Sequence, residues 1–145
     1  MRCPDVNVLL YAHRRDHRHH DWYRQWMEDL ANGSEPFAIS SLAAIALIRI
    51  VTQPSFPGGP TPVPLVVAEI ENLLRVPTCR WILPGPRHWE LVSRLVRETG
   101  ATGKHVGDAQ HAAVAIENGC AWVTRDTDFE RYRYHGLRLE ILAPE

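Results

Sequence analysis

The sequence predicts a three-layer α/β/α protein, with helices on both faces of a central, mostly parallel sheet of about five strands. Short strand-like segments alternate along the chain with longer segments of helical periodicity, as in a parallel sheet with crossover helices. One run, Ser41–Val51, is apolar nearly all round, which predicts a helix buried in a core or at a subunit contact. The length of 145 residues suits one sizeable core, so we expect a single domain over residues 1–145.

The first half of the chain supplies two predicted strands and four predicted helices. Strands are expected at Arg2–Pro4 and Pro36–Ser40, and helices at Asn7–Arg14, Asp21–Asn32, Ser41–Val51 and Leu65–Val76. The second of these helices has Trp22, Tyr23, Trp26, Met27 and Leu30 at helical spacing, and Gly33 follows it as a stop signal. The Pro- and Gly-rich stretch Gln53–Pro62 predicts a loop.

The second half continues the alternation. Strands are expected at Arg80–Leu83 and Ala121–Thr124, with a last edge strand at Arg138–Leu142, and helices at Arg87–Thr99 and Gly107–Asn118. In sheets of this kind, ligands bind beyond the carboxyl ends of the strands, near the point where the strand order reverses. The residues that follow the strands are therefore the candidates for a functional site.

Composition narrows the classes of function. Sixteen Lys and Arg residues against seventeen Asp and Glu give a net charge of −1, which excludes a purely electrostatic nucleic-acid binder but permits a basic rim around an acidic pocket. The three cysteines are isolated in apolar sequence and are expected to be buried free thiols. No apolar run reaches the ~18 residues of a membrane span, and no secretory signal is recognised, so we expect a cytoplasmic protein without a membrane partner.

Aspartates occur at three predicted junctions between a strand and a helix. Asp5 follows the first strand, Asp108 opens the predicted helix Gly107–Asn118, and Asp126 follows the strand Ala121–Thr124, with Asp128 two residues later. Any one of them is explained at least as well by helix capping, because Asp is a preferred N-cap residue. Several carboxylates on one rim are different, because clustered anions repel and destabilise the fold unless a cation lies between them.

Carboxylate oxygens at a shallow rim suit Mg²⁺ or Mn²⁺, which retain several waters and share positions with phosphate oxygens. The chemistry expected of such a site is phosphodiester hydrolysis, in which the metal activates a water and neutralises charge on the leaving oxygen.

Four sequence blocks carry a resemblance to a known family. DVNVLLYA, RIVTQP, DAQHAAVAIENG and TRDTDF resemble the signature blocks of PIN-domain ribonucleases, and in particular the VapC toxins of bacterial VapBC toxin–antitoxin pairs. The blocks have the family's order and spacing over nearly the whole chain. The resemblance implies that Asp5, Asp108 and Asp126 are catalytic metal ligands and that Asp128 is an accessory ligand.

One position departs from the family pattern. Many members carry a Glu three residues before an Arg in the helix after the second strand, whereas here the residue three before Arg49 is Ala46. This removes a metal ligand, so we expect one well-held metal ion and a second that is weak or supplied with the RNA.

Further residues have both a functional and a structural interpretation. Asn7 and Thr124 flank the outer aspartates and could orient metal-bound water, or act only as caps. His111, three residues after Asp108, could contact substrate or transfer a proton, or be a structural histidine. Arg49 could pair with a rim carboxylate or simply emerge at a helix end. The His- and Arg-rich stretch 13–20 fits a solvated basic connection better than a metal site, and it could line the path of an RNA backbone.

The sequence thus favours a metal-dependent endoribonuclease toxin acting on RNA. The alternative is a catalytically weakened PIN-fold regulatory module that acts through its partner. A nucleotide-binding domain is disfavoured because no phosphate-binding glycine motif follows a strand. The resemblance also implies a VapB-type antitoxin whose C-terminal segment wraps the toxin, sending an Arg into the acidic pocket. We expect this segment near Trp22, Trp26 and the helix Ser41–Val51, and a symmetric homodimer formed through the helices on either side of the Pro-rich loop.

Overall fold

The computed structural model describes residues 1–145 and contains one five-stranded sheet. All neighbouring strands are parallel, in the order β3-β2-β1-β4-β5. The strands are β1 (Arg2–Pro4), β2 (Phe37–Ser40), β3 (Cys79–Ile82), β4 (Ala121–Thr124) and β5 (Arg138–Ile141). The predicted fold class is confirmed, and the last segment is an edge strand as expected.

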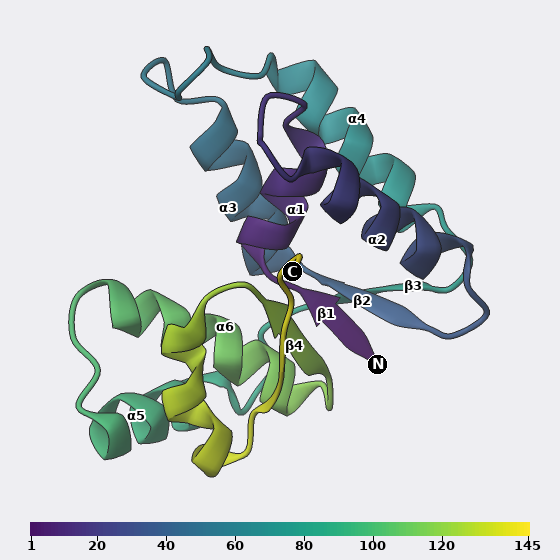
Figure 1. Ribbon diagram of the computed structural model, residues 1–145. Coiled ribbons are helices and arrows are strands. Elements are labelled where there is room, and N and C mark those ends of the chain that lie inside the picture. The colour runs from purple at the N-terminus through teal and green to yellow at the C-terminus, as the bar shows by residue number, and fades with distance from the viewer.

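The helices form two groups on opposite sides of the sheet (Figure 1). One group is α1 (Val6–His13), α2 (His20–Asn32), α3 (Ser41–Val51) and α4 (Val63–Leu74). The other is α5 (His88–Thr99), α6 (Lys104–Glu117) and the 3₁₀ helix η1 (Thr127–His135). Right-handed crossovers explain this division, because the chain moves across the sheet in one direction from β1 to β3 and in the other from β3 to β5.

One hydrophobic core joins the two helical groups through the sheet. It is a cluster of 31 buried residues that includes Phe37 of β2, Val114 of α6 and Trp122 of β4. The buried Tyr23 hydroxyl donates a hydrogen bond to the carbonyl oxygen of Leu142 (3.0 Å), which ties α2 to the end of the sheet. The apolar segment Ser41–Val51 does form a helix, and its inner face, including Ala44 and Leu47, belongs to this core.

Two features of the second half differ from the sequence prediction. Helix α6 begins at Lys104 rather than at Gly107, so Asp108 lies in its second turn and is not a helix cap. The sequence prediction placed the start of the helix at Gly107, but Gly107 is helical. The residue that precedes the helix is Gly103, whose φ of +57° is not helical. The segment Thr127–His135, for which no element was predicted, forms η1.

The strand order reverses at β1, which lies between β2 and β4. Asp5 follows β1 directly, and Asp126 lies two residues beyond β4. The carboxyl ends of these neighbouring strands therefore meet at the point where α/β sheets bind their ligands. None of the helices is both long enough and apolar enough to span a membrane.

Candidate active site

Asp5 is the most buried carboxylate of the molecule, with only 5% of the residue exposed. It is the N-cap of α1, and its Oδ1 accepts a hydrogen bond from the backbone N–H of Val6 (2.5 Å). Its Oδ2 accepts one from the Thr124 hydroxyl (2.6 Å). Both oxygens of Asp5 are therefore fixed in position, and the capping interpretation of this residue is correct without excluding a second role.

Thr124, the last residue of β4, links the segments that follow β1 and β4. In addition to donating to Asp5, its Oγ1 accepts hydrogen bonds from the side-chain amide of Asn7 (3.1 Å) and from the backbone N–H of Asp126 (2.9 Å). Asn7 in turn accepts from the backbone N–H of Arg125 through its Oδ1 (3.3 Å). Asn7 and Thr124 thus orient Asp5 and the chain after β4 relative to each other.

Asp126 and Asp128 lie at the start of η1. Asp126 is the N-cap, and its Oδ1 accepts from the backbone N–H of Asp128 (2.8 Å). Asp128 faces the α6 side, where its Oδ2 lies 3.8 Å from the ammonium group of Lys104. Both side chains are partly exposed.

Asp108 approaches from α6 and is held by a histidine one turn earlier on the same helix. The His105 ring nitrogen Nδ1 lies 3.2 Å from the Asp108 carboxylate. The backbone carbonyl of His105 accepts a hydrogen bond from the Tyr132 hydroxyl of η1 (2.8 Å). Together with the Lys104–Asp128 contact, this bond fastens the first turn of α6 to η1.

Electrostatic interactions connect the three carboxylates. Burial, together with the charges of Asp108 and Asp126, raises the pKa of Asp5 from 3.8 to about 6, although the hydrogen bonds from Thr124 and Val6 oppose the rise. The pKa of Asp108 is raised too, first by burial and then by the charges of Asp126 and Asp128, against the lowering effect of His105. Aspartates from three separate segments therefore lie close enough to disfavour one another's ionisation.

The donor set fits a hard divalent cation in its chemistry, because the converging groups are carboxylates. No group of three or more His, Cys, Asp or Glu side chains is drawn together at the spacing of a metal coordination shell. The ligand assignment of Asp5, Asp108, Asp126 and Asp128 therefore remains a prediction.

Two predicted site residues form no hydrogen bond or ion pair with the four aspartates. His111 stacks on the buried Trp122 ring (centroids 5.4 Å apart, planes at 23°), and its Nδ1 is buried without a hydrogen-bond partner. Burial lowers the pKa of His111 to about 4, so the ring is neutral at pH 7 and faces the core. Arg49 is exposed on α3, and no ion pair joins it to a carboxylate, so it emerges at the helix end.

Sequence reasoning missed His105, Lys104 and Tyr132. The first two were overlooked because the helix was expected to begin after them. A helix extended to Lys104 would have placed His105 three residues before Asp108, on the same face. The contact of Tyr132 with His105 depends on the fold of η1. The sequence of η1 shows no helical periodicity, so no sequence pattern indicated this contact.

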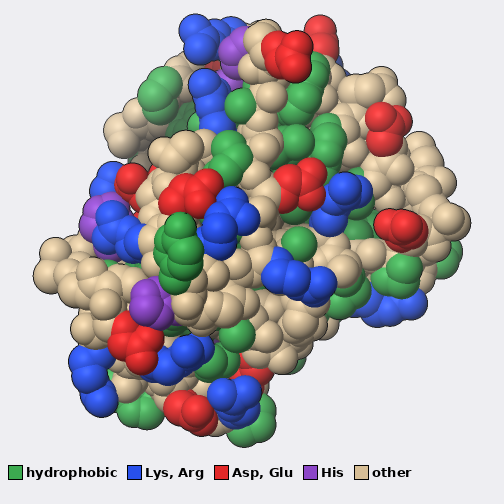
Figure 2. Space-filling view, turned by 60° about the horizontal axis from the view of Figure 1, so that its bottom comes forward, with side chains coloured by type: hydrophobic (Ala, Val, Ile, Leu, Met, Phe, Trp, Pro, Cys, Tyr) green, Lys and Arg blue, Asp and Glu red, His purple; other side chains and the backbone are tan.

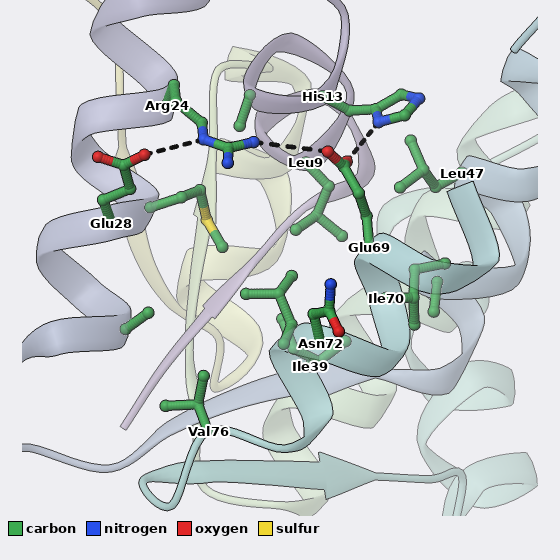
Figure 3. Close-up of a pocket in the computed structure, with 15 residues that line it drawn as sticks. Leu9, His13, Arg24, Glu28, Ile39, Leu47, Glu69, Ile70, Asn72 and Val76 are labelled. Carbon is green, nitrogen blue, oxygen red and sulfur yellow. Dashed lines mark hydrogen bonds and ion pairs between the residues drawn. The ribbon is translucent and has the colours of Figure 1, made fainter. Parts of the chain in front are cut away.

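A separate cavity of about 300 Å³ opens between α1, α2, α3 and α4. Its wall is apolar, with Leu9, Leu47 and Ile70 among its residues, and none of the four aspartates lines it. Charged side chains span it: Arg24 of α2 contacts both Glu28 (3.0 Å) and Glu69 of α4 (3.5 Å), and Glu69 also pairs with His13 (Figure 3). The helix Ser41–Val51 contributes Ala44 and Leu47 to this cavity, whereas Trp22 and Trp26 do not line it, so the expected antitoxin surface stays a prediction.

Comparison with known proteins identifies relatives over almost the whole chain. The family model of the PIN domain matches residues 2–133. The chain is 38% identical over 133 residues to the VapC ribonuclease Mb2897 of Mycobacterium bovis, covering 92% of this chain and 90% of the relative.

Two solved structures share the fold. VapBC2 from Rickettsia felis, bound to a DNA fragment from its promoter, has a TM-score of 0.68 at 21% identity and covers 96% of both chains. Mycobacterium tuberculosis VapC20, a toxin that cleaves the sarcin–ricin loop, has a TM-score of 0.65 at 14% identity and covers 99% of this chain and 100% of its own. At these identities, the structural likeness supports the fold alone.

Proposed function

The chain belongs to the PIN-domain family, and from this premise we propose that it is a metal-dependent endoribonuclease toxin. The observation that carries the proposal is the buried Asp5, whose pKa is raised to about 6 partly by Asp108 and Asp126. A fold that holds repelling carboxylates together loses stability unless a cation binds there. The curated relative in Mycobacterium bovis, similar over nine-tenths of both chains, is a ribonuclease. We assign this role to residues 1–145 as one domain, because one core joins both helical groups.

We propose that Asp5, Asp108 and Asp126 hold one Mg²⁺ or Mn²⁺ ion, with Asp128 as an accessory ligand. When bound, such an ion lowers the pKa of a coordinated water and neutralises charge on the phosphodiester. The chain's own residues supply the orientation: Thr124 and Asn7 fix Asp5 and the segment after β4, and His105 holds Asp108 from the α6 side. Ala46 supplies no oxygen where many relatives have Glu, so a second ion is weakly held.

The test measures RNA cleavage by the wild-type chain and by Asp5→Asn and Asp108→Asn, with 5′ ends of the products mapped. Asn keeps the size of Asp and, at Asp5, its capping ability while removing the charge, so both variants should lose cleavage and remain folded. EDTA should have the same effect on the wild type, reversed by excess Mg²⁺ or Mn²⁺. Asp29→Asn is the matched control, because Asp29 is exposed on α2 and contacts only Gln25. Cleavage at the wild-type level by either site variant would refute the mechanism.

We also propose that a small VapB-type antitoxin restrains this activity and that one of its apolar segments occupies the cavity between α1 and α4. Most of the cavity lining is apolar, and Arg24, Glu28 and Glu69 add charged groups to it, which suits an amphipathic segment. An antitoxin Arg that reached the aspartates would pair with them through its fork of donors and compete with the metal.

Leu73→Arg places a charge in this cavity and should weaken the complex while cleavage by the free toxin is retained. Ala68→Arg, on the exposed face of α4, is the control. Equal antitoxin affinity of both variants would exclude the cavity as the binding site.

A symmetric homodimer through α3 and α4 remains our proposal for the quaternary structure. Ile45 of α3 and Val63 and Leu65 of α4 are 63%, 53% and 59% exposed, which is costly for large apolar side chains. Sedimentation of the free chain should give a dimer, and Ile45→Arg should give a monomer.

The alternative function is a regulatory PIN module with weakened catalysis, for which the missing carboxylate at Ala46 is the one supporting observation. It predicts antitoxin binding without RNA cleavage. The three remaining carboxylates still repel one another, and a site that binds no cation gains nothing from this repulsion. The repulsion therefore favours the enzymatic function over the regulatory one.

A further inference from the structure

A cluster of aromatic and cationic side chains adjoins the segments that hold Asp5 and Asp126. Tyr11 is one helical turn beyond Asn7 on α1, so the two side chains share a face of the helix. The guanidinium of Arg125, the residue between Thr124 and Asp126, lies 5.8 Å from the centre of the Tyr11 ring. His17, from the connection between α1 and α2, stacks on the same ring with centroids 4.0 Å apart and planes at 18°.

This cluster, which we call the Tyr11 face, extends from the aspartates along α1. Arg125 is fixed at its base, because its backbone N–H donates to Asn7 and the next residue donates to Thr124. The Tyr11, His17 and Arg125 side chains are all partly exposed. The Tyr11 face is therefore fixed in position relative to the aspartates and is accessible to a ligand from solvent.

The guanidinium of Arg125 interacts with aromatic side chains rather than with a carboxylate, since it lies over the Tyr11 ring and also within hydrogen-bonding reach of the Tyr23 hydroxyl. Although it follows Thr124 and precedes Asp126, its guanidinium forms no ion pair with any carboxylate, whereas Arg14 and Arg24 both do. It is directed to the Tyr11 ring instead. Burial and the nearby cations of Arg125 and Arg18 lower the pKa of His17, so this ring is neutral at pH 7 and stacks as an aromatic group.

These groups match the chemistry of a single-stranded nucleotide. A phosphate that lies next to four carboxylates needs a nearby cation. A guanidinium group suits this role because it donates two parallel hydrogen bonds to two phosphate oxygens. Unpaired RNA bases stack on aromatic rings and on guanidinium planes, and such stacking tolerates different bases. On the face seen in Figure 2, acidic and basic side chains are interspersed and form no continuous basic field.

We propose that the Tyr11 face binds the nucleotide adjoining the cleaved phosphate, with Arg125 on its phosphate group and the Tyr11–His17 stack against its base. The proposal rests on the proposed ribonuclease function and adds to it the residues that bind the RNA substrate. It assigns to Arg125, Tyr11 and His17 a role in substrate binding, and the chemistry of cleavage remains with the aspartates.

The test uses the full chain with Asp5→Asn, so that RNA is bound without being cut, and a fluorescent single-stranded RNA of mixed sequence. Adding Arg125→Ala should weaken binding about tenfold and reduce the slope of log affinity against log salt by about 0.7, the value for one phosphate contact on a single strand. Tyr11→Leu and His17→Ala should each weaken binding about tenfold through lost stacking, with little change in the salt slope. Tyr11→Phe keeps the ring and should bind as tightly as the parent.

Arg97→Ala is the matched control, because Arg97 is exposed on α5, on the other side of the sheet, and forms no ion pair. In the cleaving background, Arg125→Ala should raise KM with little change in kcat. Affinity and salt slope equal to those of Arg97→Ala would overturn the proposal, as would a loss of antitoxin binding with RNA binding intact. If the wild-type chain cuts no RNA, the ribonuclease assignment fails. If it cuts RNA and these variants behave as the control, only the Tyr11 face fails.

Discussion

Asp5→Asn should make the metal-free protein more stable at neutral pH, even though it abolishes activity. The pKa of Asp5 is raised from 3.8 to about 6, mainly by burial, so the folded state holds the proton more tightly than the unfolded chain does. The contribution of Asp5 to stability is therefore complete below about pH 4 and is lost as the pH rises through about 6. At about 1.4 kcal/mol for each pH unit between these values, the ionised carboxylate costs about 3 kcal/mol at pH 7.5.

Asparagine carries no charge and so removes this cost. The gain is expected to be about 1–3 kcal/mol, because the new amide fits its surroundings less well than a protonated carboxyl group, and 1 kcal/mol corresponds to roughly 2–4 °C in Tm for a chain of this size. Thermal and urea unfolding in EDTA should show the variant above the wild type at pH 7.5, with the difference vanishing near pH 4. Adding Mg²⁺ should reverse the order, because the ion stabilises only the form that binds it.

The control for this experiment is Asp29→Asn, whose effect on stability should not vary in this way with pH. If Asp5→Asn were less stable than the wild type at pH 7.5 in EDTA, or if the difference between them did not depend on pH, the proposed repulsion at Asp5 would be refuted. Equal stabilisation of both proteins by Mg²⁺ would place the ion elsewhere.

Three further predictions concern single side chains around the site. Thr124→Val removes the hydroxyl that donates to Asp5 and accepts from Asn7 and Asp126, so kcat should fall at least tenfold while the sheet is retained, as circular dichroism would show. Asp128→Asn should reduce cleavage less than Asp5→Asn in parallel assays, because Asp128 is an accessory group that faces Lys104. Ala46→Glu should leave cleavage unchanged or increase it, and it should lower the Mg²⁺ concentration that gives half-maximal rate.

The sequence predicted those helices, strands and site residues that depend on the local pattern of apolar and polar residues. The strands Arg2–Pro4 and Ala121–Thr124 and the helix Ser41–Val51 have the predicted bounds. The helix is an almost continuous apolar segment, and each strand ends just before an aspartate-containing segment that begins the next helix. Asp5 and Asp126 follow from the strands that precede them. Asp108 was predicted from its place at the start of a helix, and that place was wrong because α6 begins at Lys104. The resemblance of the surrounding blocks to the PIN family related all three aspartates to catalytic positions.

The sequence did not predict contacts between distant segments. The position of Arg125 against Tyr11 depends on two elements more than 100 residues apart, and nothing in either segment indicates it. His111 is a second case: helical spacing left both a substrate-contacting and a structural role open, and only the packing against Trp122 shows that the ring is directed into the core. Spacing gives the direction of a side chain around a helix, and the neighbouring element decides whether that direction is toward solvent or interior.

The way in which the aspartates are held explains how the fold tolerates their repulsion. Asp5 and Asp126 cap α1 and η1, and each accepts a backbone N–H at the start of its helix. The partial positive charge of the α1 N-terminus offsets part of the cost of ionising Asp5. Asp108 lies in the second turn of α6, beyond the free N–H groups of that helix, and depends on His105 instead. The caps therefore fix two carboxylates, whereas the third is held only by a side chain. Among the proposed ligands, Asp108 is for this reason the one expected to adjust as a cation binds.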